Sequence, residues 1–262
     1  MFLIRRFQIC VLIIALVIPF QSFPVQAVSP AAIATGNSTF RSDFPQGVLA
    51  TLEITPEAYI QNARLNVTLD GTVLNSTDAI VPAHQPGDTI TVEARWNGRS
   101  LTRDPSPPWM PLQLWWTVVD STGNSIQTTP ENHIYTDETN RRPWATTEGV
   151  YVTVHTYNQG GSFIQQAAAI GDDAVARLQL IFGYGLPFRP ALVFYNQAAD
   201  GDADFGSGLS VPFGGYVVGR AYPGTSGVVM LARSDSAYMQ RTITHELTHL
   251  YQYQLGPQLF DA

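Results

Sequence analysis

Between residues 39 and 135, several short segments have hydrophobic side chains at every second position, and this period of two restricts how the first half of the chain can fold. The alternation is clear at residues 48–54 and 63–69 and returns at 89–96, while residues 112–119 form a strongly apolar segment. Alternation places every second side chain on the same face of a strand. Short strands separated by turns predict two sheets packed face to face.

The number and spacing of these strands are typical of a small β-sandwich of the immunoglobulin kind, which we assign to residues 39–140. Trp115 and Trp116 are neighbours in its most apolar strand, so they point to opposite faces. We expect at least one of the two indoles to fill the sandwich core. The alternative is an aromatic platform that binds a glycan.

The hydrophobic rhythm changes after a polar, proline-containing segment at residues 136–144. A helical stripe at residues 162–182 contains Phe163, Ala167, Ile170, Ala174, Leu178 and Ile181, and Gly183 ends it. Strands are expected at 150–157, 191–195, 211–218 and 227–231, with a last helix at 236–253. This order predicts an α+β domain with a mixed sheet at residues 141–262.

Residues 1–27 have the three parts of an export signal. Arg5 and Arg6 give the positive start, an apolar stretch covers residues 7–20, and small residues suited to cleavage follow. We therefore expect a secreted or cell-surface protein in which residues 28–38 form a linker. The alternative is an uncleaved signal, which would be the one route to membrane attachment.

Composition excludes several classes of function. The net charge is −7 and there is no basic run, so a nucleic-acid partner is not expected. Cys10 is the single cysteine and lies within the signal, so the exported chain is expected to have no disulfide or thiol nucleophile. The sequence specifies no oligomeric state.

One short motif carries chemistry. In the last predicted helix, His245 and His249 are four residues apart and project from the same face. Two imidazole nitrogens at this spacing can bind one tetrahedral Zn²⁺. Glu246, between them, is placed to act as a general base without being a ligand.

The chain resembles gluzincin-type zinc metallopeptidases, in particular a bacterial "peptidase MA-like" group. The resemblance is carried by the Thr-His-Glu-Leu-Thr-His run at 244–249, the preceding segments 213–220 and 228–231, and, upstream, Trp115-Trp116, the 120–124 turn and the Arg-Arg-Pro-Trp segment 141–144. It implies a zincin-like domain, Zn²⁺ as cofactor and a peptide or protein substrate, with His245 and His249 as zinc ligands and Glu246 as base.

The same resemblance implies a third ligand, a glutamate in a Trp-Leu-x-Glu-Gly-like segment of a downstream helix. Residues 250–262 contain no such segment, so we expect a zincin-like domain that is incomplete at its C-terminus. Asp261 is the one oxygen ligand that remains near the end. The metzincin pattern does not fit, because Gln252 and Leu255 replace its glycine and third histidine.

Three further predictions concern the surroundings of the motif. Zincins bind substrate along a sheet edge, for which residues 216–219 and 228–231 are the two candidates. Asp200, Asp202 and Asp204 are spaced like half of a calcium loop, but Phe205 replaces its glycine, so a solvated acidic loop is favoured. The remaining histidines, His84, His133 and His155, are expected to be structural.

Two functions are consistent with these sequence features. The first is an exported zinc-dependent peptidase that cleaves peptide bonds. The alternative is a non-catalytic cell-surface or matrix-binding protein, in which the sandwich binds the partner and the zincin-like part is degenerate or truncated.

Overall fold

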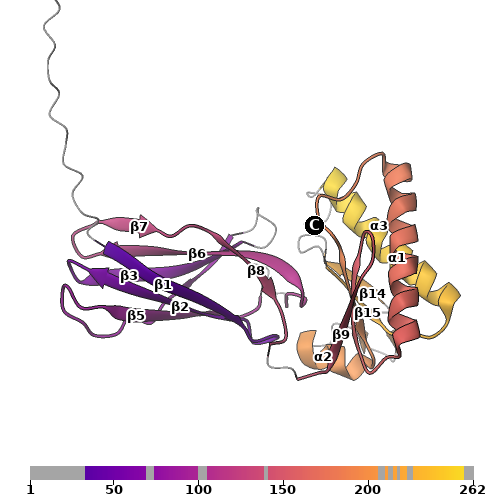
Figure 1. The fold of residues 1–262 in the computed structure, drawn as a ribbon, viewed down its shortest axis with the longest axis horizontal. Coiled ribbons are helices and arrows are strands. Elements are labelled where there is room, and N and C mark those ends of the chain that lie inside the picture. The colour runs from indigo at the N-terminus through magenta and orange to yellow at the C-terminus, as the bar shows by residue number, and fades with distance from the viewer. Residues whose placement is uncertain are drawn as a thin grey trace, which may run out of the picture. The chain divides into compact units, whose positions relative to one another are not determined.

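The computed structural model describes residues 33–68, 74–99, 105–138, 141–205, 210–211, 215–216, 219–222 and 227–256. Within these ranges the chain is a β-rich α+β protein with three helices (Figure 1). None of these helices combines the length and apolar character that a membrane span requires. The predicted signal at residues 1–27 and Asp261 lie outside the described residues.

The N-terminal strands form two antiparallel sheets. One contains β1 (Ile33–Ser42), β2 (Val48–Pro56) and β5 (Ile90–Trp96), in the order β1-β2-β5. The other contains β4 (Leu74–Asp78), β3 (Ile60–Thr68), β6 (Met110–Asp120) and β7 (Ser125–Gln127) in that order, and β8 (Glu131–Tyr135) also pairs with β6. Because β1 begins at Ile33, the strands start inside the segment 28–38 that was predicted as a linker.

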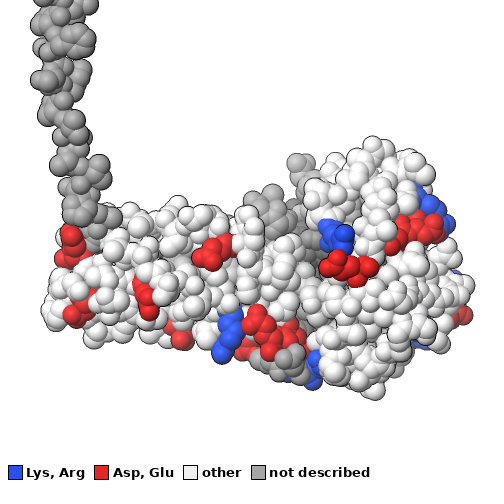
Figure 2. Space-filling model, in the orientation of Figure 1, with Lys and Arg blue, Asp and Glu red and all other residues white. Residues whose placement is uncertain are grey.

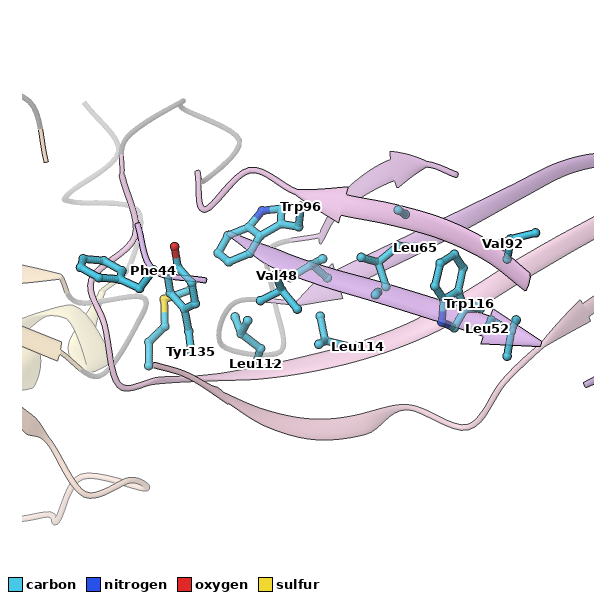
Figure 3. Packing of buried hydrophobic residues seen from close by; sticks show 14 of the residues in the cluster. Phe44, Val48, Leu52, Leu65, Val92, Trp96, Leu112, Leu114, Trp116 and Tyr135 are labelled. Atoms are coloured by element: carbon cyan, nitrogen blue, oxygen red, sulfur yellow. The ribbon is translucent and has the colours of Figure 1, made fainter. Parts of the chain in front are cut away.

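Alternate residues of these strands form a common core, as the period of two predicts. In β2, buried and half-buried residues alternate from Val48 to Pro56. Trp116 is completely buried, and Figure 3 shows it among Leu52, Leu65 and other apolar side chains of the core. Trp115 is half-buried on the opposite face of β6. The expectation that one indole fills the core is confirmed.

The C-terminal half contains a mixed five-stranded sheet in the order β14-β15-β11-β10-β9. β10, β11 and β15 are parallel, whereas β9 and β14 are antiparallel to their neighbours. The strands are β9 (Trp144–Glu148), β10 (Thr153–Tyr157), β11 (Ala191–Tyr195), β14 (Gly219–Tyr222) and β15 (Gly227–Leu231), with a separate pair β12 (Ser210–Val211) and β13 (Gly215–Tyr216). The helices are α1 (Gly161–Phe182), α2 (Ala198–Phe205) and α3 (Ser236–Leu255).

The helices α1 and α3 cover one face of this sheet. Their apolar residues share a core with Val154, Leu192 and Val228, one from each parallel strand. The predicted stripe of α1 holds as far as Leu178, but Ile181 is 74% exposed. Ile181 lies in the last turn, directly before Gly183 ends the helix in a left-handed conformation (φ 78°), and nothing in the described core covers it.

The prediction of a solvated acidic loop at Asp200–Asp204 is wrong. This segment belongs to α2, and Asp204 is buried. Its carboxylate accepts one hydrogen bond from Arg142 at 2.7 Å, two from Arg141 at 3.2 Å and one from the Tyr195 hydroxyl at 2.7 Å. The two guanidinium groups offset the cost of burying the charge, which explains why Asp204 need not face water.

The three histidines outside the motif have structural roles, as predicted. His84 accepts a hydrogen bond from the Ile60 backbone N–H, and His133 is hydrogen-bonded to Ser42. His155 stacks on Trp109 with ring centroids 4.1 Å apart and is hydrogen-bonded to Thr146. Burial lowers the pKa of His155 to about 3, so its ring is neutral near neutral pH.

Replacing Asp204 by alanine tests the buried ion pair. Removal of Asp204 takes the buried carboxylate away from both guanidinium groups and from the buried Tyr195 hydroxyl, so we expect the free energy of unfolding to fall by about 3 kcal/mol. The matched control is Asp78→Ala, which removes the exposed partner of Arg64 and is expected to cost at most about 1 kcal/mol. Urea denaturation of both variants measures the difference, and equal losses would contradict the structural role of Asp204.

Candidate metal centre

The helix α3 presents the motif and begins at a well-defined cap. The Asp235 side chain accepts a hydrogen bond from the Tyr238 backbone N–H at 2.7 Å. This satisfies one of the backbone donors that a helix start leaves unpaired. At the other end, the Gly256 N–H donates to the carbonyls of Gln252 and Tyr253. The motif is therefore held inside a regular helix rather than in a loop.

Packing of α3 decides which motif residues face solvent. Met239, Ile243, Leu247 and Leu250 are buried against the sheet and α1. Their spacing of three and four residues gives the helix one apolar face. His245 is exposed and His249 is half-buried, so both imidazoles lie away from that face.

The two motif histidines converge on one point. Their Nε2 atoms are 3.2 Å apart, with the ring planes nearly perpendicular. Two nitrogens bound to one tetrahedral Zn²⁺ at the usual distance lie about 3.3 Å from each other. The imidazoles are thus already spaced as two ligands of one tetrahedral ion.

Gln252 orients the second imidazole. The Oε1 atom of Gln252 accepts a hydrogen bond from Nδ1 of His249 at 3.1 Å. This assigns the hydrogen of a neutral ring to Nδ1 and leaves the lone pair on Nε2, which is the atom that faces His245. This role of Gln252 was not predicted from the sequence, although its position three residues after His249 on a helix was a signal for it.

Glu246 points to the sheet rather than to solvent. Its side chain is 6% exposed, and burial raises the pKa of its carboxyl group. The imidazoles of His245 and His249 and the backbone N–H of Ala221 act in the opposite direction and favour the carboxylate. A buried carboxylate that is more basic than usual, next to two imidazoles, is suited to accept a proton.

The strand β14 forms the floor beneath this carboxylate. A side chain at Gly219 would begin 2.7 Å from Cγ and Oε1 of Glu246, so only a glycine leaves room for the observed contact. Among the described residues, β14 is also an edge strand of the sheet and pairs with β15 alone. Of the two predicted edges, residues 228–231 are wrong because β15 lies between β14 and β11 and pairs with both. The other candidate, residues 216–219, shares only Gly219 with β14, and Tyr216 belongs to the separate strand β13.

The described residues bring together two candidate metal ligands and no more. Within them, no third histidine, cysteine, aspartate or glutamate joins His245 and His249 in a group that could hold a metal ion. The distance between the two Nε2 atoms and the hydrogen bond between Nδ1 of His249 and Gln252 fit Zn²⁺ at two of its positions. Asp261, the predicted oxygen ligand, lies outside the described residues.

Comparison with known proteins gives little further information. No protein-family model and no curated protein sequence matches the chain. Among solved structures, the chain is similar to the ApaA protein from Bordetella pertussis, with 14% identity and a TM-score of 0.26 over 43% of this chain and 98% of that one. A polysaccharide deacetylase from Bacillus cereus is 10% identical, with a TM-score of 0.29 over 65% of this chain.

The chain also has a distant structural similarity to an aminopeptidase N family protein from Idiomarina loihiensis. The identity is 7% and the TM-score 0.29, over 80% of this chain. The chain spans 47% of that protein's length and 54% of the deacetylase's length. With TM-scores below 0.5, these similarities support no argument about function.

Replacing Gly219 by alanine tests the contact between β14 and Glu246. The new methyl group has to displace the glutamate side chain or the strand, so we expect a loss of about 1–3 kcal/mol in the free energy of unfolding. In a Glu246→Ala background the same change should cost much less, because the obstructing side chain is absent. Chemical denaturation of the four proteins gives this coupling directly.

The matched control is Gly161→Ala, since a side chain at that helical position meets nothing within 4 Å. It should leave stability unchanged or raise it slightly. If Gly219→Ala costs the same with and without the Glu246 side chain, the close approach of the two residues is refuted.

Proposed function

We propose that this chain carries the active-site helix of a zinc-dependent peptidase. The observation that supports this best is the geometry of three neighbouring residues. The Nε2 atoms of His245 and His249 converge at 3.2 Å, and Glu246 is buried beside them against the sheet edge. Two convergent imidazoles with a basic carboxylate are a recurring arrangement for metal-assisted hydrolysis.

In this proposal His245 and His249 hold the ion and Glu246 handles the proton. Zn²⁺ bound there would supply Lewis-acid chemistry, polarising the peptide carbonyl and making water more acidic. Glu246 accepts the proton that the attacking water gives up and then donates it to the nitrogen of the departing amine. Its raised pKa suits both steps, since the group must take up a proton and release it again.

We further propose that the substrate backbone pairs with β14. This strand is the edge nearest to Glu246, and an extended peptide can add to such an edge through main-chain hydrogen bonds. A peptide in that position would bring its carbonyl group next to the carboxylate. The side chains of the substrate would then point alternately to the two faces of the sheet.

The rest of the chain is consistent with an exported peptidase. The strand order β1-β2-β5 facing β4-β3-β6, with β7 and β8 on the outer side of β6, supports an immunoglobulin-like sandwich as an accessory domain before residue 141. The pattern of residues 1–27 supports export to the cell surface or the medium.

Metal analysis tests the proposal. We expect the purified chain and its Glu246→Gln variant to contain zinc by mass spectrometry, whereas His249→Ala should contain none, because one ligand is lost. His84→Ala is the matched control, since that histidine lies in the loop between β4 and β5 and is hydrogen-bonded to Ile60, and it should retain the metal. Cleavage of a fluorogenic peptide library should fall by about 10²–10⁴-fold in Glu246→Gln.

Two results would decide against an enzyme. Zinc that survives in His249→Ala would place the metal elsewhere. A folded chain that takes up no zinc in any version would favour the alternative function, a non-catalytic binding protein. The observation that supports this alternative is that the described residues contain only two candidate ligands at the motif.

A further inference from the structure

The helix that carries the motif lies in a locally cationic part of an acidic protein. The whole chain has a net charge of −7. From Gly219 to Gly256, however, three arginines (Arg220, Arg233 and Arg241) stand against two carboxylates. One of these, Asp235, caps the helix, and the other, Glu246, is buried. The net exposed charge of this segment is therefore positive, with three exposed arginines and one exposed carboxylate.

Elsewhere in the described residues, most arginines are paired with carboxylates. The pairs are Arg64–Asp78, Arg95–Asp43, Arg141 and Arg142 with Asp204, Arg177–Asp173 and Arg189–Glu148. Figure 2 shows this pattern on one face, where blue and red side chains adjoin in small groups on a mostly uncharged surface. Pairing is thus the usual state of an arginine in this protein.

Arg241 does not follow this pattern. Among the described residues its guanidinium group makes a cation–π contact with the ring of Tyr238, whose centroid lies 5.6 Å from the guanidinium carbon. Arg233 lies over the same ring at 5.4 Å. No described carboxylate lies within ion-pair distance of either arginine. The helix dipole gives them no compensation, because it favours cations at the other end of a helix. The described part of the fold therefore offers no partner for this charge.

Arg241 lies one turn before His245, on the same side of α3. Four residues correspond to a rise of about 6 Å along the helix. Both side chains line an open hollow of about 410 Å³, and its other described lining residues are Ala237, Gln240, Thr244 and Thr248. A ligand in this hollow would meet a guanidinium group at one end and an imidazole of the motif at the other.

We propose that this hollow binds a carboxylate of the peptide substrate and that Arg241 determines the preference for it. A guanidinium group matches a carboxylate with two parallel hydrogen bonds, and it needs an anionic partner that the described protein does not supply. The substrate class is therefore a peptide with an acidic side chain, or with its own C-terminal carboxylate, close to the bond that faces His245. This inference rests on the proposed function for its location.

Equilibrium binding of peptides tests the preference separately from catalysis. The chain carries Glu246→Gln so that no peptide is consumed, and zinc is present throughout. Three labelled peptides of one length are compared by fluorescence anisotropy: a neutral amidated peptide, the same peptide with one glutamate, and the neutral peptide with a free C-terminus. The last two distinguish a side-chain carboxylate from a terminal one.

We expect at least one carboxylate peptide to bind roughly tenfold more tightly than the neutral peptide, as for a charge-assisted hydrogen bond. Arg241→Gln should abolish this difference, and Arg241→Lys should restore only part of it, because a lysine lacks the planar fork. Arg177→Gln is the matched control. It removes the same charge from an exposed position on α1 and should leave the preference intact.

Two outcomes would overturn the inference: no preference for a carboxylate in the parent chain, including no binding of any peptide, or a preference that persists in Arg241→Gln. Failure of the proposed function has a different signature. A chain that takes up no zinc and cleaves nothing, yet prefers carboxylate peptides through Arg241, would be a binding protein for acidic peptides.

Discussion

The candidate site depends on the way in which one face of α3 is buried. Met239, Ile243, Leu247 and Leu250 bind the helix to the sheet, and their position fixes its rotation about its own axis. Because neighbouring residues of a helix differ by about 100° in direction, this rotation also sets the directions of the motif side chains. Glu246 consequently turns inward to β14, while the two imidazoles remain accessible. The chemistry of the motif is thus a consequence of hydrophobic packing along the same helix.

The other face of the mixed sheet depends on a polar and aromatic cluster. Arg142 lies over the rings of Tyr157 and Tyr195 at 5.3 and 5.4 Å and forms an ion pair with Asp204. Trp144, on the edge strand β9, packs edge-on against both tyrosines. These contacts connect the segment before β9 with α2 and with two strands of the sheet, so they support the sheet that α3 packs against.

Most of the helices and strands whose hydrophobic residues recur with a clear period could be predicted from the sequence. The alternation in β2, β5 and β6 and the helical stripes of α1 and α3 reflect the burial of one face, and burial is what selects hydrophobic side chains. The motif residues were found because their spacing on a helix carries the chemistry. Whether they bind zinc stays a prediction.

The elements that were not predicted, α2 and β9, have local sequences that do not favour a helix or a strand. α2 contains three aspartates and a glycine, and its Asp204 is paired with arginines some sixty residues earlier in the sequence, which no local pattern reveals. β9 is short and polar and has no alternation of buried residues, so its assignment depends on its pairing with β10. The contact of Gly219 with Glu246 was not predicted either, because it exists only where the two separate elements β14 and α3 pack together.

The burial of the His155 ring has a consequence for where such a protein can work. The folded chain keeps this imidazole neutral down to about pH 3, whereas the unfolded chain takes up the proton near its ordinary pKa of about 6.5. Acid therefore favours the unfolded state progressively between these two values. Through this one buried ring, the fold is better suited to neutral surroundings than to an acidic compartment or an acidified medium.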